Sequence, residues 1–71
     1  MTNTELLKQK INDSGYKISF LAERVNLTPQ GFYKKLKDGS DWTFSQVMIL
    51  QDLLRLSKEE IDAIFFNPEV E

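Results

Sequence analysis

The sequence predicts an all-α fold, a compact domain of five short helices. Apolar residues recur at helical spacing along its 71 residues, and no run of alternating apolar and polar residues lies between hairpin turn signals. Glycines, prolines and helix-capping residues divide this pattern into segments of helical length. A chain of this length forms one domain, which we expect over residues 1–66, with a short C-terminal tail over residues 67–71.

The first two helices are separated by Gly15, where a helix can end in a left-handed residue. Thr4 is positioned to cap the first helix, and the second is expected from about Ile18 to Val25. Both carry apolar residues at the spacing that places them on one face of a helix. The residues expected to face the core are Leu6, Leu7, Ile11, Leu21, Ala22 and Val25.

The third helix is expected to start after Thr28 and to reach about Lys37. Pro29 fits its first position, because the N–H group that proline lacks would have no helical partner there. Gly39 and Ser40 then break the chain.

Two capping boxes mark the starts of the last two helices. Thr43 with Gln46, and Ser57 with Glu60, have the S/T-x-x-E/Q spacing in which side chains and backbone N–H groups pair reciprocally. Pro68 is expected to stop the fifth helix, because proline cannot continue it.

The fourth helix is apolar on more than one side, so we expect it to be the central and most buried helix. Trp42 and Phe44 are expected to close the core at its start. In the fifth helix Phe65 is expected inward, while Phe66 points elsewhere. The apolar residues that support these expectations are Phe44, Val47, Ile49, Leu50, Leu53, Leu54, Ile61, Ile64 and Phe65.

The composition argues against several classes of function. The chain has no cysteine and no histidine, which removes disulfides, thiolate metal sites, the commonest general base and the commonest zinc ligand. Carboxylates do not pair in a pattern typical of a catalytic cleft, so we expect no enzymatic activity, metal, cofactor or small-molecule ligand. No apolar run approaches the roughly 20 residues that cross a membrane. No charged-then-apolar leader opens the chain, so we expect a cytoplasmic protein.

The charge is distributed unevenly. Residues 1–40 carry seven Lys and Arg against four Asp and Glu, whereas residues 41–71 carry two against seven. The net charge is −2. This asymmetry fits a basic face in the first half and an acidic face elsewhere.

Residues 21–36 fit two helices that cross steeply over a short link. Ala22 is small where the helices would cross, and Asn26 in the link is the best non-glycine residue for a positive φ. This is the logic of a helix-turn-helix, with the motif at about residues 18–37. Apolar residues hold both helices to the core: Leu21, Val25, Leu27, Phe32 and Leu36.

The stretch LAERVNLTPQGFYKKL at residues 21–36 resembles the helix-turn-helix of the lambda-repressor/Cro (XRE-type) superfamily. The resemblance covers most of the chain, since five helices with the motif in the second and third is that family's architecture. SDWTFS at residues 40–45 and LSKEEIDAIFF at residues 56–66 resemble a phage-associated Cro-like subgroup with paired Phe near the C-terminus.

Three positions depart from the family's pattern. Asn26 stands where the family usually has Gly. Lys35 occupies a position that is often apolar, and Leu36 takes the core role one residue later. Gly31 stands where many relatives have Ser or Thr, which weakens the helix by up to about 1 kcal/mol and removes one possible hydroxyl contact.

The resemblance implies a sequence-specific transcriptional regulator of the phage or prophage Cro/repressor kind that binds double-stranded DNA. The third helix, about residues 29–37, would lie in the major groove. Gln30 is the sharpest candidate, because a carboxamide can pair with adenine N6 and N7. The implied base-reading residues are Thr28, Pro29, Gln30, Gly31, Tyr33 and Lys34. The implied phosphate-binding residues are Lys17, Ser19, Lys37 and Ser40.

One small module touches a single half-site, so we expect a weak homodimer on a pseudo-palindromic operator. The fifth helix has more apolar residues than one buried face needs, and the expected interface is Ile64, Phe66 and Val70. The alternative is a protein-interaction module, an anti-repressor or adaptor without DNA binding. The overall acidity and the lack of a basic arm favour this alternative.

Overall fold

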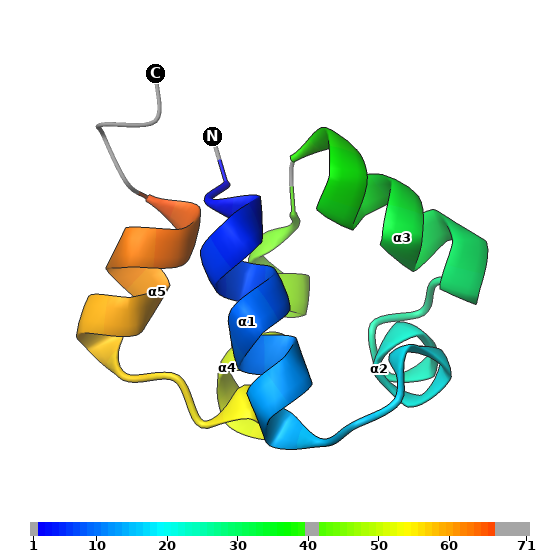
Figure 1. Cartoon of the computed structure of the whole chain (residues 1–71), viewed down its shortest axis with the longest axis horizontal. Coiled ribbons are helices and arrows are strands. Elements are labelled where there is room, and N and C mark those ends of the chain that lie inside the picture. Colours follow the sequence, from blue (N-terminus) through cyan, green and yellow to red (C-terminus); the bar gives the residue numbers. More distant parts are fainter. Residues whose placement is uncertain (1, 40–41, 67–71) are drawn as a thin grey trace.

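The computed structural model describes residues 2–39 and 42–66, and these ranges form five α-helices and no strand (Figure 1). The prediction of a compact all-α domain with five helices is confirmed. No helix in this part of the chain has the length and apolarity to span a membrane. The helices are α1 (Thr4–Ser14), α2 (Ile18–Arg24), α3 (Pro29–Asp38), α4 (Phe44–Leu54) and α5 (Lys58–Phe65).

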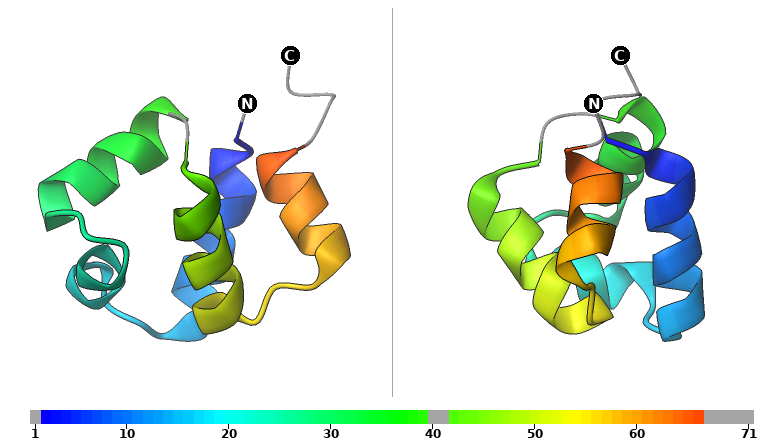
Figure 2. Two further views of the ribbon diagram at one scale, coloured as in Figure 1. Left: turned by 180° about the vertical axis from the view of Figure 1, so that it is seen from behind. Right: turned by 90° about the vertical axis from the view of Figure 1, so that its left-hand side faces the viewer.

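The helix that holds the domain together is α1, which packs against α3, α4 and α5 (Figures 1 and 2). Its Leu7 is fully buried and Ile11 nearly so. The prediction that the fourth helix is the central one is wrong. α4 buries Val47 and Leu50, whereas Phe44 is 78% exposed and Met48 is 47% exposed. An apolar residue on a helix is covered only where a neighbouring element lies over it, and the described elements cover one side of α4.

The helix ends follow local chemistry. Gly15 (φ 79°) and Gly39 (φ 63°) end α1 and α3 in the left-handed conformation, in which a Cβ would be unfavourable. The cap of α1 differs from expectation. Asn3, not Thr4, is the N-cap, and its Oδ1 accepts a hydrogen bond from Leu6 N at 3.2 Å. Asn is at least as good an N-cap as Thr. With Asn3 as the cap, Thr4 is the first residue of the helix.

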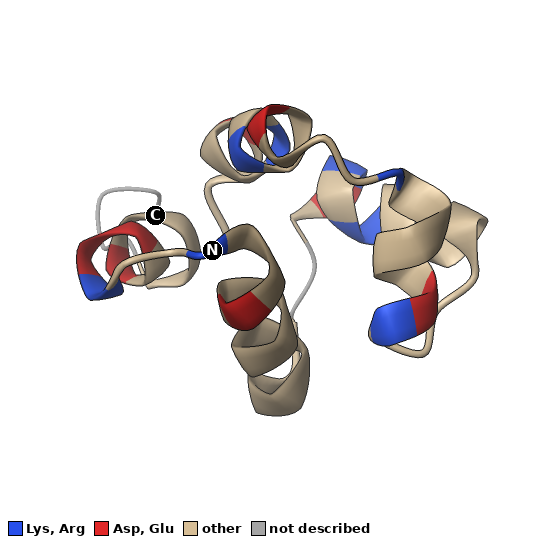
Figure 3. Cartoon of the chain, turned by 90° about the horizontal axis from the view of Figure 1, so that it is seen from below, with Lys and Arg blue, Asp and Glu red and all other residues tan. Residues whose placement is uncertain are grey.

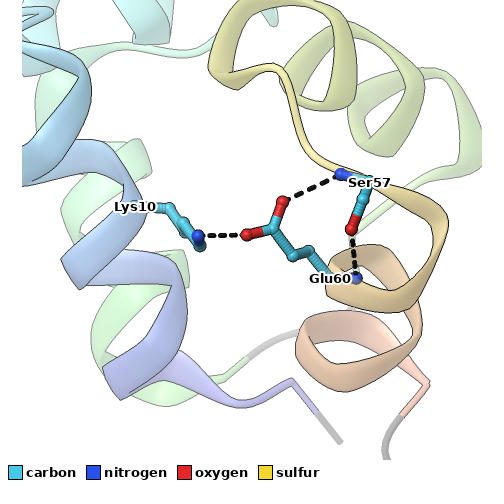
Figure 4. A network of polar contacts seen from close by, with 3 residues as sticks. All are labelled: Lys10, Ser57 and Glu60. Carbon is cyan, nitrogen blue, oxygen red and sulfur yellow. Dashed lines mark hydrogen bonds and ion pairs between the residues drawn. The ribbon is translucent and has the colours of Figure 1, made fainter.

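Both predicted capping boxes are present, and one of them also joins two helices. At α5, Ser57 Oγ accepts from Glu60 N at 3.1 Å, and Glu60 Oε1 accepts from Ser57 N at 2.9 Å. Glu60 Oε2 accepts a hydrogen bond from Lys10 Nζ on α1 (Figure 4). This bond from Lys10, followed by the backbone bond from Ser57, lowers the pKa of Glu60. The box at α4 is formed by Thr43 and Gln46.

An aromatic cluster connects α3 to the last two helices. The ring of Trp42 meets Phe32 edge-on at 5.4 Å between centroids, and Phe65 at 6.4 Å. Lys35 lies half-buried beside it, with Nζ 5.4 Å from the centroid of the Trp42 ring. This contact explains how a lysine occupies a core-edge position, because its stem packs while the ammonium faces an aromatic ring. Trp42 therefore closes the core as predicted, but the exposed Phe44 does not.

Candidate nucleic-acid interface

The junction between α2 and α3 brings these helices into contact at a steep angle. Figure 1 looks nearly along the axis of α2, whereas α3 lies across the picture. The chain turns at Asn26, whose φ is 61°, as the sequence predicts. Leu27 N donates to the carbonyl of Ala22 at 2.8 Å, which closes the turn. Ala22 is fully buried, so its small side chain leaves room for the close approach of the second helix.

The orientation of α3 divides its side chains into two faces. Phe32 is fully buried and Leu36 nearly so, and they attach the helix to the core. Gln30, Tyr33, Lys34 and Lys37 are exposed. Their spacing of three, four and seven residues places these four side chains on one outer stripe of the helix. The stripe offers a carboxamide, a phenol and two ammonium groups to a partner.

The N-terminus of α3 explains Gly31 without a ligand. Thr28 is the N-cap, and its Oγ1 accepts a hydrogen bond from Gly31 N at 3.0 Å. A Cβ added at Gly31 would lie 3.2 Å from that same oxygen, so a larger residue would crowd the cap. Pro29 occupies the first helical position and is exposed. The Thr28 oxygen accepts one bond in the cap, and the hydroxyl can still donate a hydrogen bond to a base.

The stripe borders a surface pocket between α1 and α3. Tyr33 and Lys37 line it from α3, Lys8 lines it from α1, and Tyr16 lines it from the segment before α2. Lys8 and Tyr16 are site residues that the sequence reasoning missed, because nothing in their spacing connects them to α3. The Lys8 ammonium lies 4.0 Å from a Glu5 carboxylate oxygen, which offsets part of its charge at the surface. The remaining lining residues are Ile11, Asn12, Gly15, Ile18 and Leu36.

Of the predicted phosphate-binding residues, Lys37 belongs to the stripe itself, and the others come from outside α3. Lys17 is exposed at the N-cap of α2, and its neighbours Tyr16 and Ile18 line the same pocket as Tyr33. Ser19 is exposed on α2, and Ser40 lies outside the described residues. Figure 3 shows basic bands on α1 and α3, whereas acidic bands gather on α5 at the other side of the domain. The uneven charge of the two halves of the sequence therefore appears in space as well.

The predicted self-association residues do not lie together on the surface. Ile64 is fully buried, so the prediction that it forms a dimer interface is wrong. Its position on α5 faces the core, where its carbonyl also accepts a hydrogen bond from Asn3 N at 2.6 Å. Phe66 is 62% exposed, in agreement with its predicted outward direction. Val70 lies outside the described residues.

Other kinds of site have little support in this part of the chain. Residues 2–39 and 42–66 contain no cluster of three His, Cys, Asp or Glu side chains that could hold a metal ion. No family model, curated protein or solved structure was found to match the chain. The interpretation of the α3 face therefore depends on its own geometry and chemistry.

Proposed function

We propose that the protein is a sequence-specific double-stranded DNA-binding regulator of transcription, of the Cro/repressor kind, in which α2 and α3 act as a helix-turn-helix. One observation carries the proposal. The outer stripe of α3, formed by Gln30, Tyr33, Lys34 and Lys37, is exposed, and each of its side chains carries a polar group. On the opposite side of the helix, Phe32 is buried in the core. A rigidly held helix with such a face is the element that major-groove readers use.

The first turns of α3 contact the bases in this proposal. An α-helix with side chains is about 10–12 Å across, which matches the width of about 12 Å of the major groove. Gln30 stands at the second position of the helix, where its amide can donate to adenine N7 and accept from N6. Lys34 lies one turn later on the same stripe and can donate to guanine O6 or N7. Tyr33 offers a ring to a thymine methyl and a hydroxyl to a phosphate.

Affinity comes mainly from contacts to phosphates, because these release counterions from the duplex. The ammonium groups available for such contacts are those of Lys37 at the end of the stripe, Lys17 at the start of α2 and Lys8 on α1. Three such contacts would give binding a slope of about −3 in a plot of log K against log salt. The net charge of −2 adds no general attraction, so binding by one copy should be weak. We therefore also propose that two copies bind the half-sites of a pseudo-palindromic operator.

The deciding experiment is selection of bound sequences from random duplex DNA, followed by titrations at several salt concentrations. Enrichment of one palindromic sequence, with affinity that falls steeply as salt rises, would support the proposal. Equal recovery of all sequences would refute specific reading by α3. Binding too weak to measure at low salt would refute DNA binding and favour the protein-interaction module. The exposure of Phe44 and Met48 on α4 is the observation that favours this second candidate.

A further inference from the structure

The surface pocket between α1 and α3, here called the α1/α3 pocket, has the size and lining of a small-molecule site. Its volume of about 610 Å³ lies within the range of about 300–1,000 Å³ that such sites occupy. The lining comes from α1, from the segment between α1 and α2, from the first residue of α2 and from α3. Because the pocket is assembled from separate segments, the sequence by itself predicts no ligand here. The lining residues are Lys8, Ile11, Asn12, Gly15, Tyr16, Ile18, Tyr33, Leu36 and Lys37.

The apolar part of this lining is fixed by the core. Ile11 and Leu36 are only 6% and 4% exposed, and Ile18 packs against the same core. Core packing holds these three side chains whether or not anything fills the pocket, so the pocket is largely formed before a ligand binds. A ligand gains from covering them only if part of it is apolar, because the gain comes from apolar surface removed from water.

Two exposed tyrosine rings add aromatic surface to the pocket. Tyr16 is 41% exposed and Tyr33 is 57% exposed. The Tyr16 ring is itself supported from outside the pocket, because it stacks on Phe20 with ring centroids 5.0 Å apart and an angle of 26° between the rings. Aromatic pairs gain from offset or edge-to-face packing in addition to their buried area. A flat ring is therefore the apolar group that suits this lining best.

The charged groups at the pocket have one sign. Lys8 lines it from α1 and Lys37 from α3, and none of the described residues that line it is acidic. The Lys8 ammonium lies 4.0 Å from a Glu5 carboxylate oxygen, but the Glu5 side chain is 88% exposed, so an anion can replace this weak surface pair. A carboxylate can accept hydrogen bonds from both ammonium groups and from the amide of Asn12. The lining is therefore complementary to an anion.

We propose that the α1/α3 pocket binds an aromatic carboxylate. The ring covers the apolar residues and meets the tyrosine rings, while the carboxylate pairs with Lys8 and Lys37. The pocket is open to solvent and the ligand is small, so the expected dissociation constant is on the order of 1 mM for a ligand of about ten non-hydrogen atoms.

The ligand also regulates DNA binding, and this part of the inference rests on the proposed function. Tyr33 and Lys37 belong both to the pocket and to the outer stripe of α3. A bound carboxylate occupies the Lys37 ammonium and adds negative charge beside the surface that would face phosphates, so the ligand and the duplex compete. The concentration of the small molecule then determines how much of the protein is free to bind DNA.

Titration of isotope-labelled protein with phenylacetate up to about 20 mM, followed through its amide chemical shifts, tests the pocket. The largest shifts should occur at the lining residues. Phenylacetamide is the matched neutral ligand and acetate is the anion without a ring, and each should bind at least about fivefold more weakly. The proposal would be overturned by an absence of shifts, by equal affinity for phenylacetamide, or by shifts concentrated at the other surface pocket, which Met48 and Leu53 line.

Variants of the lining test which groups bind the ligand. Lys8→Gln should reduce the preference for phenylacetate over phenylacetamide by about two- to fivefold. Lys58→Gln is the matched control, because it makes the same change of charge at an exposed position of α5 outside the pocket, and its preference should equal that of the wild type. Tyr16→Ala should weaken both ligands, and the amide spectrum of each variant reports whether it is folded. Equal effects of Lys8→Gln and Lys58→Gln, or unchanged binding by Tyr16→Ala, would overturn the assignment.

Competition is measured with the duplex obtained by selection. Phenylacetate at about nine times its own dissociation constant should raise the apparent dissociation constant of the duplex about tenfold, relative to acetate at the same ionic strength. Unchanged DNA affinity in the presence of bound phenylacetate would overturn the competition but not the pocket. A protein that binds no duplex would refute the proposed function and the competition with it, whereas the titrations of the protein alone decide the pocket independently.

Discussion

Replacing Phe32 with alanine tests whether α3 is held in the orientation described. Phe32 is the largest fully buried side chain, and its ring meets Trp42 edge-on at 5.4 Å. Loss of a buried phenylalanine costs about 3–5 kcal/mol, including the cavity that remains. A domain of this size has an unfolding free energy of only about 4–10 kcal/mol, so the substitution removes a large share of it. At about 4 °C or more per kcal/mol, the melting temperature should fall by at least about 12 °C.

Thermal and urea unfolding followed by circular dichroism would measure this loss. Tyr33→Ala is the matched control, because Tyr33 is the next residue of α3 but is 57% exposed. Its melting temperature should stay within a few degrees of the wild type, since exposed sites change stability by about 0.5 kcal/mol or less. Equal melting temperatures for the wild type and Phe32→Ala would mean that α3 presents a different face to the core. The stripe proposed to read DNA would then be misassigned as well.

Three further predictions concern the proposed function and the link between α1 and α5. Gln30→Ala should cost about 1–3 kcal/mol at one base pair and relax the selected sequence there, and an unchanged sequence would exclude Gln30 as a reader. Lys37→Ala should weaken binding to all duplexes about equally and reduce the salt slope by about 1, whereas a change of preferred sequence would contradict a phosphate contact. The lowered pKa of Glu60 means that its bond to Lys10 stabilises the fold above the ordinary glutamate pKa of about 4.3, and that this stabilisation is lost as the pH falls through the lower pKa of the folded state. Denaturant titrations from pH 6 to pH 3 should therefore show that the unfolding free energy falls more steeply for the wild type than for Glu60→Gln, a variant that keeps the capping-box pattern. An equal fall of the unfolding free energy in both proteins would show that the bond contributes nothing.

Much of the secondary structure could be predicted because its signals are local. A capping box needs two residues three positions apart, and the boxes at Thr43 and Ser57 form as their spacing indicates. Gly15 and Asn26 adopt positive φ for reasons that lie within their own backbone. The sequence predicts the first N-cap at Thr4, one residue too late, because Asn3 and Thr4 are both competent caps and the local sequence does not choose between them.

The candidate site could be predicted only in part. The two faces of α3 follow from helical periodicity, so the burial of Phe32 and the exposure of Gln30 were expected. The approach of Lys8 and Tyr16 to that face was not, because they precede α3 by more than ten residues and meet it through packing. Gly31 illustrates a third case. The short distance between a Cβ at this position and the Thr28 oxygen depends on the rotamer of the Thr28 side chain, which the sequence does not specify.

By itself, the sequence determined the number of helices, most of their ends and which residues of α3 share a face. These properties depend on backbone preferences and on periodicity within one element. The tertiary structure alone decided that α1 is central, that Ile64 is covered and that Phe44 and Met48 are not. Hydrophobicity shows that a side chain is better buried, but burial requires a neighbouring element on that side. For a helix that is apolar on several sides, the positions of the other helices decide which side the core receives and which remains for a partner.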